Sequence, residues 1–139
     1  MQKKDFVWEE RVRIYDTDAQ GIVHYAGYYR FFTDAFEQFA RSRFGLNWPL
    51  ANNKVWFVVV ESHAKYHKPL RLGDRIRTHV HATRIGTKAL EFSFRIYNGA
   101  ELSCEGEIVQ VAINNRTWKS IALPRSMVTK LREMGAPPG

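Results

Sequence analysis

The strongest pattern in this sequence is a helical one between Tyr28 and Phe44. Apolar residues recur there at helical spacing, at Tyr28, Tyr29, Phe32, Ala35, Phe36, Phe39 and Ala40. Gly45 follows as a typical C-terminal stop, with Arg41 and Arg43 near the negative end of the helix dipole. At about 1.5 Å per residue, this predicts a helix roughly 25 Å long. Its apolar stripe is wide and bulky, so we expect a sheet to wrap around it.

Alternating patterns predict the strands of that sheet. Apolar and polar residues alternate from Trp8 to Tyr15, which indicates a half-buried strand. Further strands are expected over residues 55–67, 75–84, 90–96 and 102–113, separated by turn signals at Pro69, Gly73-Asp74, Gly86 and Asn98-Gly99. A short helix is expected over residues 124–134. This order predicts an α+β fold in which a curved antiparallel sheet of about five strands encloses one long helix.

Composition limits the class of protein. The chain has 139 residues, of which 45% are hydrophobic and 14% aromatic, so we expect one folded domain over residues 1–139. The longest apolar run, residues 55–60, is too short to span a bilayer, and no apolar stretch follows Met1 as in a signal peptide. Cys104 is the only cysteine and forms no internal disulfide. These features favour a reducing, cytoplasmic compartment and no membrane anchor.

The net charge of +7 raises the prospect of an anionic partner: nucleic acid, a membrane surface or a phosphorylated small molecule. The basic residues are spread along the chain rather than gathered in a tail, and most of them are expected to be solvated surface. No recognition-helix pattern and no ribonucleoprotein-type aromatic spacing is present, so we expect no nucleic-acid binding. The charge alone does not choose among the other anions.

Candidate chemistry is concentrated between residues 15 and 29. Asp16 and Asp18 follow the first strand, a turn at Gly21 comes next, and then the aromatic helix begins. This order brings a carboxylate close to a helix N-terminus, whose free N–H groups can hold a developing negative charge. A carboxylate with an oxyanion site is the minimum equipment for hydrolysing an acyl ester. The structural alternative is that such an Asp is a turn former or an N-cap.

Three segments resemble the hotdog-fold thioesterases, specifically the 4-hydroxybenzoyl-CoA thioesterase-like family, and the resemblance covers nearly the whole chain. The first is the acid-x-acid-x-x-Gly-Ile-Val signature at residues 16–23, which runs into the aromatic helix. The second is the aromatic-x-x-Pro-x-x-x-Gly-Asp turn at residues 66–74. The third is the turn at residues 114–117 with the approach to the C-terminal helix at residues 121–124.

The resemblance implies an acyl-CoA thioesterase that releases a free acid and CoA. Its catalytic carboxylate falls on Asp18, as nucleophile or as general base, and the backbone amide of Tyr25 or its neighbour would polarise the thioester carbonyl. Asp16 would support the loop. His24 either orients the substrate or merely sits in the loop, and its order with Tyr25 is reversed relative to some family members. Gly27 is a second departure, since relatives often carry Asn there.

The resemblance also suggests substrate-binding residues. Tyr28 is early enough in the helix to touch an acyl group. Regular alternation over residues 55–67 puts Val58, Val60 and Ser62 on one strand face, and Glu61 and His63 on the other. One of Glu61, Ser62 and His63 would line the acyl pocket of a neighbouring subunit; the alternative is ordinary polar sheet residues. The turn between the third and fourth strands carries Arg84 and Lys88, the candidates for binding the CoA phosphates.

Assembly and cofactors are expected to follow the family. We expect a homodimer with active sites at the interface, and a tetramer built from two such dimers. Glu105 and Glu107 share a strand face with the apolar Val109, Val111 and Ile113, which is typical of an interface. No metal and no organic cofactor are expected. The pair His79 and His81 lacks a third ligand, and Cys104 is read as a buried apolar residue without a histidine partner.

Two other functions stay open. A hotdog hydratase or dehydratase would act on acyl thioesters with an acid–base pair such as His24 and Asp18, although the usual hydratase histidine motif is lacking. A non-catalytic acyl-CoA binding protein would bind the same ligand without releasing CoA. Hydration of crotonyl-CoA, measured beside free thiol release, separates these alternatives.

Overall fold

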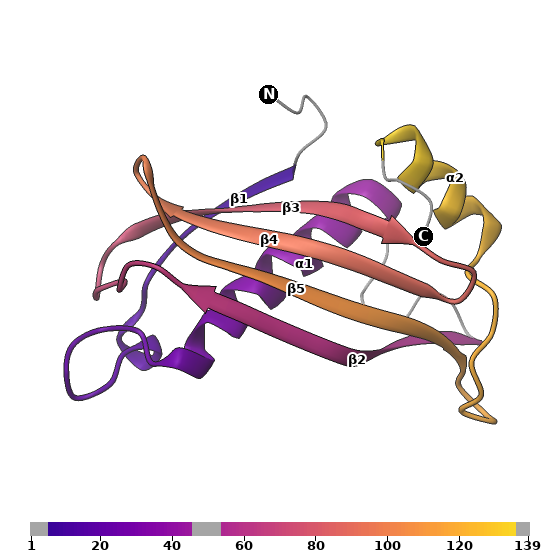
Figure 1. Cartoon of the computed structure of the whole chain (residues 1–139), viewed down its shortest axis with the longest axis horizontal. Coiled ribbons are helices and arrows are strands. Elements are labelled where there is room, and N and C mark those ends of the chain that lie inside the picture. Colours follow the sequence, from indigo (N-terminus) through magenta and orange to yellow (C-terminus); the bar gives the residue numbers. More distant parts are fainter. Residues whose placement is uncertain (1–5, 46–53, 136–139) are drawn as a thin grey trace.

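The computed structural model describes residues 6–45 and 54–135 (Figure 1). The strands and helices, in chain order, are β1 (Phe6–Arg11), α1 (Tyr28–Phe44), β2 (Val55–Tyr66), β3 (Arg75–Ile85), β4 (Ala89–Asn98), β5 (Glu101–Asn114) and α2 (Arg125–Glu133). Two short 3-10 turns, η1 (Ile14–Asp16) and η2 (Tyr25–Gly27), lie between β1 and α1. The five strands form one antiparallel sheet in the order β1-β3-β4-β5-β2, which curves around α1. The predicted α+β architecture is confirmed.

The core lies between α1 and the sheet. Phe31, Phe32 and Phe39 of α1 are at most 2% exposed. Phe32 stacks on Phe94 of β4 with ring centroids 5.0 Å apart, and further aromatic pairs join α1 to the same strand. The helix ends as expected, since Gly45 adopts a left-handed conformation with φ of 66°. The helical period therefore identified both the element and its buried face.

Gly106 allows α1 to approach the sheet closely. A β-carbon at this position would lie 2.6 Å from two ring carbons of Phe32 and 3.2 Å from the carbonyl oxygen of His63. No side chain fits in that space without displacing the helix or β2. Helix and sheet thus contact each other directly over this glycine.

The first strand is shorter than the alternating pattern predicts. It ends at Arg11, and Ile14 and Tyr15 are 73% and 69% exposed instead of half-buried. The Val12 N–H donates to the Asp74 carbonyl, after which the chain turns away from the sheet into η1. The expectation of a strand to Tyr15 was therefore wrong at its C-terminal end.

A bulge in β2 changes the faces expected for that strand. Val59 lies opposite Gln110 and Glu61 lies opposite Val109, so Val60 is an extra residue. As a result Ser62 shares the helix-facing side with Phe57, whereas regular alternation puts it with Val58. On β5 the expected exposed face holds for Val109 and Val111, which lie on the outer face with Glu105 and Glu107 between buried residues, but Ile113 is only 4% exposed, so the expectation was wrong for that residue.

The C-terminal helix also matches its prediction. Met127 and Leu131 of α2 are buried against the core. Across the described residues, neither helix has the length and apolar character needed to cross a membrane.

Candidate active site

Asp16 organises the loop between β1 and α1. Its side chain is 2% exposed. One carboxylate oxygen accepts hydrogen bonds from the Arg13 N–H at 2.8 Å and from Arg30 Nη2 at 2.6 Å, and the other accepts from Arg30 Nε at 2.5 Å. The carboxylate therefore starts η1 and fastens it to the first turn of α1. This local hydrogen bonding is why the chain leaves the sheet before Tyr15.

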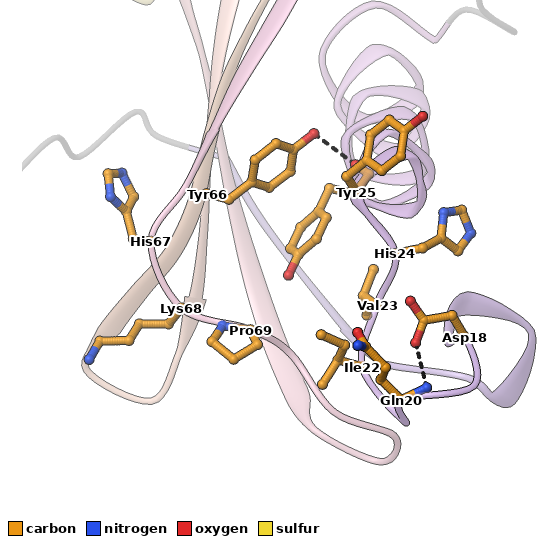
Figure 2. A pocket seen from close by; sticks show the side chains of 11 residues that line it. Asp18, Gln20, Ile22, Val23, His24, Tyr25, Tyr66, His67, Lys68 and Pro69 are labelled. Carbon is orange, nitrogen blue, oxygen red and sulfur yellow. Dashed lines mark hydrogen bonds between the residues drawn. The ribbon is translucent and has the colours of Figure 1, made fainter.

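Asp18 occupies the tip of a tight turn in this loop. Its N–H donates to the Ile22 carbonyl at 3.0 Å, and its carbonyl accepts from the Gly21 N–H at 2.9 Å. Gly21 has φ of 77°, which favours glycine. The Gln20 N–H donates to one carboxylate oxygen of Asp18 at 2.8 Å. Within the described part of the chain the other oxygen has no hydrogen-bond partner, and Figure 2 shows it directed away from Gln20.

The η2 turn supplies candidate oxyanion donors. The Gly27 N–H donates to the His24 carbonyl at 2.8 Å, which polarises the peptide that carries the Tyr25 N–H. Neither the Tyr25 nor the Ala26 N–H donates to an acceptor in residues 6–45 and 54–135. These amides belong to a 3-10 turn that precedes α1, because the α-helix itself begins at Tyr28. The candidate oxyanion amides were expected at the start of the long helix; they lie instead in the short turn just before it.

Gly27 lies in a tightly packed part of the loop, and its dihedral angles do not favour glycine. A β-carbon there would lie 3.0 Å from Val23 Cγ1, 3.3 Å from the Asp16 carbonyl oxygen and 3.4 Å from His24 Nε2. A side chain at this position therefore requires Val23 or the Asp16 carbonyl to move by a few tenths of an ångström. Glycine at this position thus goes with a close contact between η1 and η2.

A pocket of about 540 Å³ opens beside Asp18 (Figure 2). Its lining residues are Asp18, Gln20, Ile22, Val23, His24, Tyr25, Tyr28, Tyr66, His67, Lys68 and Pro69. The Tyr66 ring meets Tyr28 edge-on, with centroids 5.1 Å apart, and burial raises the pKa of Tyr28. The pocket thus brings Asp18, with its free carboxylate oxygen, together with Tyr25 of the η2 turn and an aromatic wall.

The end of β2 is the part of the site that sequence reasoning missed. Tyr66, His67, Lys68 and Pro69 line the pocket, but the sequence pattern marked them only as a strand and its turn. The available signal was the aromatic-x-x-Pro motif itself, at residues 66–69. The isolated bridge between Ile22 and Arg71 brings this turn against the Asp18 loop.

The other predicted binding residues lie outside this pocket. Glu61, Ser62 and His63 belong to the exposed middle of β2, and His63 Nε2 pairs with Glu107 Oε1 at 2.6 Å on the outer sheet face. Arg84 lies at the far end of β3, about 30 Å from Arg75 at roughly 3.3 Å per residue. Lys88 follows in the next turn, with Nζ 3.4 Å from Ser120 Oγ. Arg84 and Lys88 are therefore at the opposite end of the sheet from Asp18.

No metal centre is formed by the residues that the structure describes. In residues 6–45 and 54–135 no group of three His, Cys, Asp or Glu side chains is arranged to hold a metal ion. His81 instead lies 3.1 Å from Ser93 Oγ, and the His79 ring packs on Tyr97. The Cys104 thiol is buried, which raises its pKa to about 12 and makes it a poor nucleophile at neutral pH.

This fold and site coincide with a known family. The family model of the thioesterase-like superfamily matches residues 12–131, from the end of β1 into α2. The chain therefore belongs to the thioesterase-like superfamily, and it is a thioester hydrolase with the hotdog fold.

Individual relatives agree with this assignment. The chain is 32% identical over 129 residues to the acyl-CoA thioester hydrolase YbgC of Escherichia coli O6:H1, covering 92% of this chain and 96% of that protein. It is 29% identical over 92 residues to a 1,4-dihydroxy-2-naphthoyl-CoA hydrolase of Thermosynechococcus vestitus, covering 66% and 63%. A hypothetical protein from Staphylococcus aureus, solved in complex with CoA, superposes with a TM-score of 0.87 at 25% identity, covering 99% and 89%.

Proposed function

We propose that this protein hydrolyses an acyl-CoA thioester to the free acid and CoA, with Asp18 as the reacting carboxylate. The observation that carries the proposal is that one pocket is lined by Asp18, which has a free carboxylate oxygen, and by Tyr25, whose N–H has no acceptor among the described residues. The names of YbgC and of the naphthoyl-CoA hydrolases support an acyl-CoA substrate.

The hydrolysis needs two things from the protein. The thioester carbonyl oxygen gains negative charge when its carbon is attacked, and the Tyr25 N–H would stabilise that charge. One such donor is typically worth about a hundredfold to a thousandfold in rate. Asp18 then acts in one of two ways. It attacks the carbonyl carbon to form an anhydride that water cleaves, or it takes a proton from the attacking water. In both routes the CoA thiolate leaves and is protonated, so no metal or organic cofactor is needed.

The pocket lining favours an acyl group with a flat or apolar body. Tyr25, Tyr28, Tyr66 and Pro69 offer aromatic and apolar surface, while His24 stands at the pocket beside Asp18 (Figure 2). A benzoyl-type group or a short to medium aliphatic chain is compatible with a volume of about 540 Å³. Lys68 adds a positive charge at the pocket rim, where the anionic part of CoA would enter.

We further propose a homodimer through the free edge of β2. This strand has twelve residues, and among the described residues it pairs only with β5; its Val59 and Val60 are exposed. A long unpaired edge of this kind favours pairing with a second copy. An antiparallel pairing of two β2 edges reverses the strand direction, so Arg84 of the partner subunit would come to the Asp18 end of the sheet. In such a dimer Arg84 and Lys88 of one subunit could serve the CoA phosphates bound at the Asp18 site of the other.

Thiol release tests the proposal. Wild type and Asp18→Ala are assayed with aromatic and aliphatic acyl-CoA substrates, and crotonyl-CoA hydration is followed in parallel. We expect CoA release from at least one substrate by the wild type, with the rate lost in Asp18→Ala. Equal slow release by both proteins rejects the enzyme mechanism. Hydration without thiol release assigns the hydratase alternative instead. The tetramer and the cytoplasmic location stay predictions.

A further inference from the structure

We propose that Arg30 is the positioning residue of this site: it holds the Asp18 loop and the oxyanion turn at a fixed separation. The proposal rests on the function given above, because it concerns the distance between the proposed reacting carboxylate and its proposed oxyanion donor. Neither the family signature nor the sequence pattern marks Arg30. It lies in the first turn of α1, two residues after the pocket residue Tyr28.

Arg30 fixes the loop through Asp16. Its Nε and Nη2 donate to the two oxygens of the Asp16 carboxylate at 2.5 and 2.6 Å, a bidentate geometry. Asp16 is itself bonded to the Arg13 N–H, and its carbonyl accepts from the His24 N–H at 3.4 Å. Through its buried carboxylate and its backbone carbonyl, Asp16 therefore connects the start of the Asp18 loop, the residue before η2, and Arg30.

The guanidinium is held on its remaining sides as well. Nη1 donates to Glu10 Oε1 of β1 at 3.1 Å and to Asp34, one turn further along α1. The planar group lies 4.6 Å from the ring centroid of Phe31 and 5.4 Å from that of Tyr15. The hydrogen bond with Asp16 is the largest of the effects that raise the pKa of Arg30, so the group stays charged. β1, η1 and α1 thus meet at a single side chain.

Glu10 makes this cluster sensitive to pH. Its Oε2 atom is buried without a hydrogen-bond partner in the described residues. Burial, followed by the nearby charge of Asp34, raises the pKa of Glu10 to about 7, and Arg30 opposes that rise. Glu10 also borders a surface pocket whose other charged groups are Glu9, Arg11, Arg75 and Arg77, and the residue opposite it on β3 is the apolar Ile76. When Glu10 ionises, the carboxylates of Glu10, Asp16 and Asp34 are all negative beside the Arg30 guanidinium. Glu10 then competes with Asp16 for the hydrogen bonds of Arg30.

The consequence for catalysis is geometric. The hydrogen bonds of Asp18 itself are to neighbours within the turn, and the far side of that turn is fastened to the end of β2 by the Val23 N–H bond to the Leu70 carbonyl and by the Ile22–Arg71 bridge. The contact of Asp16 with Arg30 fastens the near side of the turn to α1. A misplacement of about 1 Å between reacting groups costs on the order of a hundredfold in rate. Weakening the hydrogen bonds of Arg30 should therefore lower kcat. It should leave KM nearly unchanged, because Arg30 is not one of the residues that line the pocket.

The test compares Arg30→Lys with Arg41→Lys. Lysine keeps the charge but cannot bind both Asp16 oxygens as a fork, and Arg41 is an exposed arginine on the same helix. We expect Arg30→Lys to lower kcat for thiol release about ten- to a hundredfold, with KM within about twofold and a wild-type circular dichroism spectrum, and Arg41→Lys to behave as wild type. Asp16→Asn removes the same ionic contact and should reproduce the loss if Arg30→Lys does not fold.

Two further measurements separate positioning from general stability. Adding Arg30→Lys to Asp18→Asn should cost no further rate, because a positioning residue acts only through the group it positions. We expect the wild-type kcat to change near pH 7, where Glu10 ionises beside Arg30, and Glu10→Gln to lose that change. The proposal is overturned if folded Arg30→Lys has a kcat within about twofold of wild type. It is also overturned if the rate losses of Arg30→Lys and Asp18→Asn multiply in the double variant. If Asp18→Asn alone keeps the wild-type rate, it is the proposed function that fails.

Discussion

The Tyr66 hydroxyl donates a hydrogen bond to the carbonyl oxygen of Tyr25 at 2.7 Å. This bond joins the last residue of β2 to the turn that carries the candidate oxyanion amides, across a sequence separation of 41 residues. The aromatic wall of the pocket is thus hydrogen-bonded directly to the η2 turn. Disturbing either side of the bond should affect catalysis.

Tyr66→Phe removes this hydrogen bond but keeps the ring that packs on Tyr28. A net bond of this kind is worth about 0.5–1.5 kcal/mol, so we expect kcat to fall by up to roughly tenfold with little change in KM. Steady-state thiol release measures it. Tyr97→Phe, on the outer face of β4, is the matched control and should leave kcat unchanged. A Tyr66→Phe enzyme with wild-type kcat would show that the bond does not organise the turn.

Glu10 should make the stability of the fold depend on pH. Its pKa is raised from 4.5 to about 7 in the folded protein, chiefly by burial. Between these values the folded protein keeps a proton that the unfolded chain has released, so the free energy of unfolding falls as pH rises through that window.

Glu10→Gln cannot lose this proton. The Tm of the variant minus that of the wild type should therefore become more positive from about pH 5 to about pH 8, by calorimetry or dichroism. Glu9→Gln, at the exposed neighbouring position, should give a nearly constant difference. A Tm difference for Glu10→Gln that does not change with pH would mean that Glu10 titrates as an ordinary carboxyl.

Gly106→Ala should destabilise the protein. The new methyl group would lie 2.6 Å from the buried Phe32 ring, and overpacking of this kind costs typically about 1–3 kcal/mol. Urea unfolding measures the loss. Gly86→Ala is the control. Its β-carbon would lie 3.4 Å from its nearest neighbour, the Ala89 carbonyl oxygen, so this substitution should be tolerated. Equal midpoints for the two variants would show that helix and sheet can separate without cost.

The periodic spacing of apolar residues along the sequence predicted most of this fold. The apolar stripe of α1 faces one continuous core, so its spacing alone defined the helix. The alternating strands were found for the same reason. The bulge at Val60 was not predictable, because residues 55–60 are all apolar and carry no alternation that a shift could interrupt. The faces of Ser62 and Glu61 depend on that shift.

The site was predictable only where its residues are close in sequence. Asp18 and Tyr25 come from one loop and were singled out together. Tyr66 and Lys68 reach the pocket because β2 runs along the edge of the sheet and ends beside that loop. The end of β1 was misjudged because Asp16 is bonded to Arg30, 14 residues further on, and no local pattern records that contact.

The most direct test of the central claim is the rate of thiol release by Asp18→Asn. Asparagine keeps an oxygen that can accept from the Gln20 N–H, so the turn is preserved while the carboxylate is lost. We expect kcat on the best acyl-CoA substrate to fall at least about a hundredfold, with CoA binding retained in calorimetry. A folded Asp18→Asn protein that binds CoA and hydrolyses the substrate at the wild-type rate would contradict the role assigned to Asp18.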